Sequence, residues 1–263
     1  MWRIGAAAVG LAFVLAGCGG GGGGSASAAS IAQAAAKTSQ AGSVKADFQV
    51  AGPGATGTGT GVFNTGQNRS GRLSMQLQVN GRTSTLESVV AGNVLYMQSP
   101  VFAQAGLAGR QEWVKLDLQK LAQQRGVDLS SLVNASPTPT SALTYLRGAR
   151  DVKKIGSETV AGTKTTHYRV TVDLERAAGR AQASSRASIR RVMEASGLKT
   201  LPVDAWIDGD GYLRKVAWVE HTSPTGGAAV VMLLHDFGPA VNIKPPPKRM
   251  VLDLLDRLSG GTG

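Results

Sequence analysis

The chain has 263 residues, of which 42% are hydrophobic but only 5% aromatic, and 35 are glycine. This length allows one sizeable core, and the abundance of glycine and of Thr, Ser and Val favours β-structure with many turns over a helical bundle. The net charge of +11 is not concentrated in any run of five basic residues, which argues against nucleic-acid binding and favours a basic surface near anionic lipid headgroups and wall polymers.

The first seventeen residues have the layout of a secretory signal peptide. Met1-Trp2-Arg3 is a short positive segment, and Ile4–Leu15 is an apolar run too short to span about 30 Å of hydrocarbon. It ends in Leu15-Ala16-Gly17-Cys18, which contains the sole cysteine of the chain and resembles the bacterial lipobox. The resemblance implies cleavage before Cys18 and a diacylglycerol on its thiol. The alternative is an ordinary signal peptide that ends near a cysteine.

This reading predicts three regions. Residues 1–17 are the signal peptide, and residues 18–30 are the lipidated cysteine followed by a Gly/Ser/Ala tether with a reach of roughly 20 Å. Residues 31–263 are predicted to form a single domain, held at the extracytoplasmic face of the cell membrane by the acyl chains on Cys18. The domain is expected to start with an Ala-rich helix at Ser30–Gln40, with Ser30 as its N-cap.

Amphipathic strands dominate the next part of the chain. Apolar and polar residues alternate in Ser43–Val50 and in Leu73–Val79. The Gly-rich segment Thr56–Asn64 is predicted to be a strand, because it lacks the third glycine and the following helix of a dinucleotide-binding motif. Asn80-Gly81 is the strongest hairpin-turn signal and leads into Arg82–Val90. Meanders of this kind build antiparallel sheets with one apolar and one wet face.

Further strands and three helices are expected in the second half. The strands are expected at 94–98, 112–118, 151–159, 163–174, 202–208, 212–222 and 228–237. Short helical turns are expected within 118–135, and a short helix at Thr140–Ala149. Glu175–Ser196 is the longest helix candidate, and Lys248–Leu258 is predicted to be one amphipathic helix.

Motifs for catalysis or metal binding are not found in the sequence. There is no G-x-S-x-G, H-E-x-x-H or phosphate-binding loop. Asp208-Gly209-Asp210-Gly211 resembles the start of a calcium loop, but later ligand positions hold side chains without oxygen donors, so a hairpin turn is predicted. His167, His221 and His235 each lie alone on an expected strand, which favours surface histidines over a zinc site. We expect no cofactor, metal or catalytic residue; a hydrolase centred on one histidine is the alternative, because catalytic triads are spatial.

Three segments carry a family resemblance. They are W-V-K-L-D-L within Glu112–Gly126, G-x-E-T-V-A-G-x-x-T-T-H-Y within Val152–Leu174, and L-P-V-D-A-W-I-D-x-D-G-x-L-R-K within Leu201–Val216. With the lipobox and the N-terminal strands, they make the chain similar to the LppX/LprG group of actinobacterial lipoproteins, in the LolA/LolB-like class. The resemblance implies an α+β fold, in which a strongly curved antiparallel half-barrel has helices on its concave side around a hydrophobic cavity.

The same resemblance implies a non-catalytic protein that carries or presents lipids or glycolipids in the cell envelope, for which a membrane transporter is a conceivable partner. Apolar strand faces and large side chains suggest the cavity lining. The candidates are Phe48, Leu73, Leu77, Met97, Val114, Leu116, Tyr168, Val170, Trp206 and Trp218. The periodicity is equally compatible with a solid core, so the alternative is a structural or regulatory envelope lipoprotein that acts through a protein partner.

Overall fold

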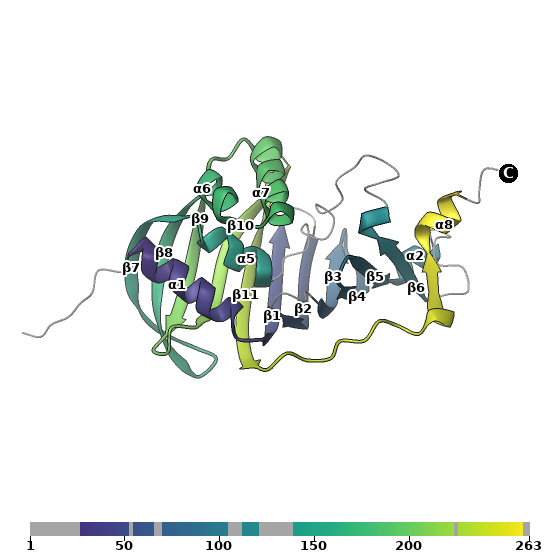
Figure 1. Ribbon diagram of the computed structural model, residues 1–263, viewed down its shortest axis with the longest axis horizontal. Coiled ribbons are helices and arrows are strands. Elements are labelled where there is room, and N and C mark those ends of the chain that lie inside the picture. Colours follow the sequence, from purple (N-terminus) through teal and green to yellow (C-terminus); the bar gives the residue numbers. More distant parts are fainter. Residues whose placement is uncertain are drawn as a thin grey trace, which may run out of the picture.

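One open sheet of twelve strands organises the described part of the chain, with helices over one of its faces (Figure 1). The computed structural model describes residues 27–52, 55–65, 70–104, 112–120, 139–223 and 226–259. The strands are β1 (Ser43–Gly52), β2 (Ala55–Asn64), β3 (Ser70–Val79), β4 (Arg82–Ala91), β5 (Val94–Gln98), β6 (Trp113–Asp117), β7 (Ala149–Val160), β8 (Thr163–Asp173), β9 (Thr200–Asp208), β10 (Leu213–Ser223), β11 (Gly226–Gly238) and β12 (Val251–Asp253). The helices are α1 (Ala28–Ser39), α2 (Pro100–Gln104), α5 (Pro139–Leu146), α6 (Leu174–Arg180), α7 (Ala183–Ser196) and α8 (Leu254–Ser259), with a 3-10 turn at Lys248–Met250.

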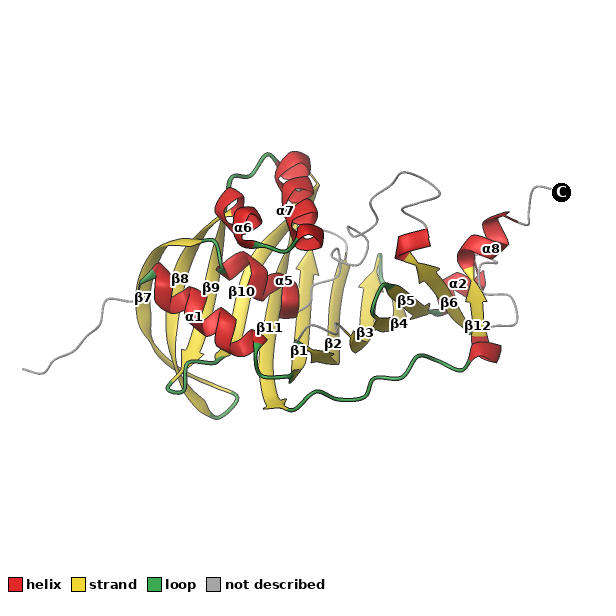
Figure 2. Cartoon of the chain, in the orientation of Figure 1, coloured by secondary structure: helices red, strands yellow, loops and turns green. Residues whose placement is uncertain are grey.

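The strand order is β12-β6-β5-β4-β3-β2-β1-β11-β10-β9-β8-β7, so the sheet has β12 and β7 as its two edges and does not close. All neighbouring strands run antiparallel except β12 and β6, which are parallel. Helices α1, α5, α6 and α7 lie over the part of the sheet that runs from β7 to β11 (Figure 2). The predicted α+β fold with a large open antiparallel sheet is confirmed.

Alternation of apolar and polar residues determines which side of each strand is buried. In β1, Val44, Ala46 and Phe48 are at most 1% exposed, whereas Lys45 and Gln49, at alternating positions of the same strand, are exposed. We call the face that carries Val44, Ala46 and Phe48 the inner face, and the opposite one the outer face. Because cross-strand partners point to the same side, the register of the sheet extends this assignment to the other strands.

The glycines of β2 leave room for side chains of the same face. A Cβ atom on Gly59 would lie 2.6 Å from Cγ of Met75, and one on Gly61 would lie 2.6 Å from Cε2 of Phe63. Larger residues at these two positions would displace buried core side chains. The strand predicted for this Gly-rich segment is confirmed, and its glycines have a packing role.

Tight turns join the hairpins where glycine was expected. Asn80 and Gly81 have φ values of 50° and 77°, and β3 and β4 pair directly across them from Val79 to Arg82. Two consecutive residues with positive φ form the type I′ turn whose twist matches that of antiparallel strands. The hairpin predicted here is confirmed.

Helix α1 is tied to β10 by a buried hydroxyl group. Thr38 is 0% exposed; its Oγ1 accepts a hydrogen bond from the Leu213 backbone N–H at 3.0 Å and donates one to the Ala34 carbonyl at 2.8 Å. The helix begins earlier than predicted, at Ala28. Ser27 and not Ser30 is the N-cap, because the Ser27 side chain accepts from the Ser30 backbone N–H.

The longest predicted helix, Glu175–Ser196, is two helices in the structure. Helix α6 ends at Arg180, and Ala181 is extended with φ −87° and ψ 154° before α7 begins. The Arg186 guanidinium of α7 donates hydrogen bonds to the carbonyl oxygens of Ala178 and Ala181. In an uninterrupted helix, these carbonyls would accept backbone N–H groups instead.

The C-terminal segment Lys248–Leu258, predicted to be one amphipathic helix, has a different structure. Val251 and Leu252 pair with β6, Lys248–Met250 form only a 3-10 turn, and the α-helix starts at Leu254. The Lys115 ammonium lies 2.8 Å from the Asp253 carboxylate, which also accepts the Leu255 backbone N–H. Strand pairing with a partner more than a hundred residues away therefore outweighs the local helical periodicity.

Candidate functional site

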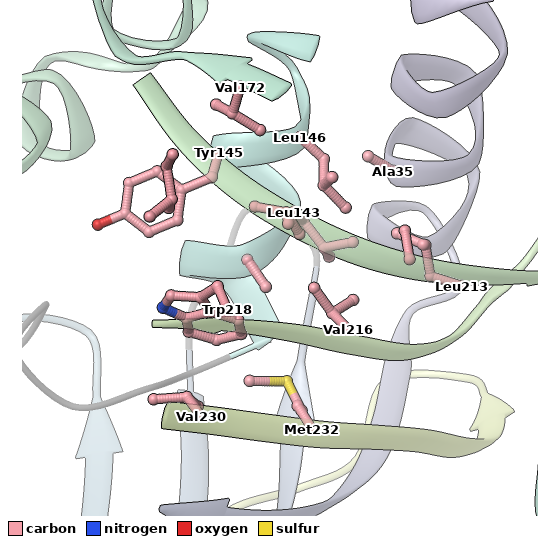
Figure 3. Close-up of a cluster of buried hydrophobic side chains, with 14 of the residues drawn as sticks. Ala35, Leu143, Tyr145, Leu146, Val172, Leu213, Val216, Trp218, Val230 and Met232 are labelled. Atoms are coloured by element: carbon pink, nitrogen blue, oxygen red, sulfur yellow. The ribbon is translucent and has the colours of Figure 1, made fainter. Parts of the chain in front are cut away.

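The inner face of the sheet is mostly apolar, with Ser84 and Ser88 among its positions on β4, and helices cover only part of it. Under α1, α5, α6 and α7 the inner side chains are almost fully buried, as Figure 3 shows for Val216, Val230 and Met232 beneath Leu143. Toward β3, β4 and β5, where Figure 2 shows no such helix layer, the inner side chains of Leu77, Leu86 and Met97 are only half-buried.

The register shows that the two parts of the inner face are continuous. One cross-strand row runs from Trp218 on β10 through Val230, Val50 and Gly57 to Leu77 on β3. Its first two members are 5% and 2% exposed, whereas Val50 and Leu77 are half-buried. An apolar surface thus leads out from beneath the helices. Such a surface suits a hydrocarbon chain, because burial of each CH₂ group stabilises a complex by about 0.8 kcal/mol.

Nine of the ten predicted lining residues share this inner face by their place in the register. Four of them, Phe48, Leu73, Val170 and Trp218, belong to the main hydrophobic core, and the half-buried Leu77 and Tyr168 pack against it. Val114 and Leu116 are buried on β6, and Met97 is half-buried on β5. Cys18, the predicted lipidation site, lies outside the described residues.

Trp206, the tenth, lies on the outer face and is therefore placed away from the other nine. It stacks on His167 with ring centroids 4.1 Å apart and planes 12° apart, and its indole N–H donates to Glu158 Oε2 at 2.8 Å. The sequence contained a signal for this placement. Trp206 alternates with Asp204 and Asp208, whereas the small and aliphatic residues of β9 occupy the inner positions.

His167 is a structural bridge between three strands of the outer face. Its Nδ1 lies 2.8 Å from Glu158 Oε1 and its Nε2 lies 2.9 Å from Asp204 Oδ1, so both ring nitrogens face carboxylates. The indole N–H of Trp206, followed by the bond to His167, holds the pKa of Glu158 below its usual range against the opposing effect of desolvation. With neither nitrogen of His167 directed at a hydroxyl group, this residue lacks the geometry of a hydrolase triad.

The other histidines add no support for the hydrolase alternative. His235 lies 3.3 Å from Asp47 Oδ2 and 3.4 Å from Asp236 Oδ2, and the His221 side chain lies outside the described residues. Within the part of the chain that the structure describes, no three His, Cys, Asp or Glu side chains gather as metal ligands. Asp208, from the predicted hairpin turn, directs its carboxylate at Arg214 and at the Tyr212 backbone N–H.

Two features of the structure were not anticipated from the sequence. One is a shallow groove of about 410 Å³ on the outer face, over β1 to β3. It is lined by Asp47, Phe48, Gln49, Thr58, Gly59, Thr60, Ser74, Gln76, Val231 and Leu233. Its hydroxyl and amide groups make it a poor match for an acyl chain. The second is the indole nitrogen of Trp218, which is buried and has no hydrogen-bond partner among the residues that the structure describes.

Known proteins resemble this chain in sequence and in fold. No protein-family model matches it. An uncharacterised 31.2 kDa protein from the rplA–rplJ intergenic region of Streptomyces griseus is 27% identical over 164 residues, or 60% of this chain and 53% of that protein. A candidate lipoprotein of Streptomyces coelicolor is 27% identical over 154 residues, or 57% of this chain and 45% of that protein. The chain thus spans about half the length of the curated relatives it matches.

Among solved structures, the lipoprotein LppX of Mycobacterium tuberculosis is similar over 82% of this chain and 97% of its own, with a TM-score of 0.50 and 16% identity. Across the described residues of this chain, no helix has the length and apolar character needed to cross a membrane. The resemblance carried by the three sequence segments is confirmed at the level of architecture: the chain has the fold of the mycobacterial lipoprotein LppX.

Proposed function

We propose that the protein is a lipid-anchored lipoprotein of the cell envelope that binds the acyl chains of a lipid or glycolipid on its inner face and carries or presents it without catalysis. The observation that carries the proposal is the continuous apolar row from Trp218 to Leu77, whose covered end is buried and whose open end is half-exposed.

The proposed anchor brings this face to its ligand. Acyl chains on Cys18 and the short tether between Cys18 and Ser27 would hold the domain within roughly 15 Å of the bilayer. Two or more chains are needed for a stable anchor, because a single chain binds membranes only marginally. Two similar proteins described as lipoproteins support this location: one shares the fold, and the other matches part of the sequence.

An aspartate placed on either face of the same strand tests the proposal. Leu77→Asp puts a carboxylate on the half-buried inner face, and the matched Gln76→Asp puts one on the exposed outer face one residue away. Because a charge is costly to bury beside hydrocarbon, we expect Leu77→Asp to reduce retained lipid about tenfold or more, and Gln76→Asp to leave it unchanged. Retained lipid is measured by extraction and mass spectrometry of the purified mature chain. Equal lipid in both variants would contradict binding on the inner face and favour a protein partner for the domain.

A further inference from the structure

The indole N–H of Trp218 is a buried donor without a partner. The side chain is 5% exposed, and its Nε1 has no hydrogen-bond partner among the described residues. Buried polar groups in folded proteins are nearly always hydrogen-bonded, so each exception needs an explanation. Trp206 provides a comparison within the same sheet, because its indole N–H on the outer face donates to Glu158 at 2.8 Å.

The surroundings of the Trp218 ring are mostly apolar. Figure 3 shows it below Leu143 of α5 and beside Val216, Val230 and Met232, with the nitrogen on the side away from Val216. Among the side chains labelled around the ring, Tyr145 alone carries a polar group, whereas a buried water is typically held by two to four polar partners. A bound water therefore fits this position poorly. An otherwise apolar molecule with a single acceptor fits it better.

We propose that Trp218 donates a hydrogen bond to the ester carbonyl oxygen of an acyl lipid, and so determines which lipids the inner face retains. The inference rests on the proposed function. An indole can only donate, so the ligand must supply an acceptor, and the uncharged apolar neighbours favour a neutral one over a phosphate or carboxylate. From the carbonyl, the acyl chain follows the row past Val230 and Val50 to Leu77, whose side chain packs over the glycine at position 57.

Two phospholipids that differ only in the carbonyl group test this assignment. The mature chain with Cys18→Ser is incubated with vesicles of dipalmitoyl phosphatidylglycerol, which has ester links, or of dihexadecyl phosphatidylglycerol, which has ether links, and retained lipid is counted by native mass spectrometry. Since one neutral hydrogen bond typically favours binding about 5- to 10-fold, we expect the ester lipid to be preferred by that factor. Trp218→Phe should abolish the preference, whereas Trp206→Phe, which removes the indole N–H of the outer face, should keep it.

The outcomes separate the two proposals. If the wild-type chain retains neither lipid, the proposed function fails and the inference fails with it. If it retains both equally, or if folded Trp218→Phe keeps the preference, lipid binding stands and the role of Trp218 is refuted. Should Trp218→Phe not fold, the wild-type indole N–H resonance of Trp218 decides the matter. It should move downfield with the ester lipid and not with the ether lipid, and an equal response to both would refute the assignment.

Discussion

Thr38→Val removes the hydroxyl group that ties helix α1, the helix nearest the tether, to the strand that carries Trp218. Valine keeps the shape of threonine, but the Leu213 backbone N–H loses its acceptor at 3.0 Å in a place where both residues are 0% exposed. A buried donor left without a partner costs about 1–3 kcal/mol. The bond to the Ala34 carbonyl adds little, because that carbonyl is also positioned to accept the helical N–H of residue 38. We therefore expect a loss of about 2 kcal/mol in the free energy of unfolding.

For a chain of this size, a loss of about 2 kcal/mol lowers Tm by about 4–8 °C. The assay is thermal and urea unfolding of the mature chain followed by circular dichroism. Thr58→Val is the matched control, because Thr58 is exposed on the outer face and its change should stay within about 0.5 kcal/mol. If Thr38→Val unfolds like wild type, the hydroxyl is not the link between α1 and β10.

Two further predictions concern the outer face and the anchor. The pKa of Glu158 is lower in the folded protein than in the unfolded chain, so its charged form stabilises the fold. This contribution is complete above the unfolded-state pKa, and it is lost as the pH falls through the folded-state pKa. Glu158→Gln should therefore flatten the acid limb of the stability curve below roughly pH 5. Acid limbs that superimpose for the variant and the wild type would contradict the Trp206–Glu158–His167 arrangement. Cys18→Ser should move the protein from the membrane fraction to the soluble fraction of its host; unchanged fractionation would count against lipidation.

Much of the fold could be predicted because it depends on local patterns. Alternation in β1 and β3 indicated which side chains face inward, and Asn80-Gly81 indicated the turn between β3 and β4. The same periodicity placed nine candidate lining residues on one face. Trp206 differs from these nine, because its alternation with Asp204 and Asp208 puts it on the outer face although its size is typical of a lining residue.

The features that could not be predicted depend on contacts between distant parts of the chain. Val251 and Leu252 belong to a helical pattern in the sequence and become strand because the edge of β6 offers unpaired backbone groups. The break between α6 and α7 depends on Arg186 reaching back to the carbonyls of Ala178 and Ala181. The missing partner of Trp218 becomes apparent only when its neighbours from β11 and α5 are in place.

The central claim, that the inner face holds acyl chains, is tested most directly by what the protein carries from its own envelope. The mature chain with Cys18→Ser, secreted by its host and purified without detergent, is analysed by native mass spectrometry and its extract is identified. The account predicts about one bound lipid per chain, lost in Leu77→Asp and kept in Gln76→Asp. A wild-type protein with the bare mass of its polypeptide, in an extract free of acylated molecules, would contradict it.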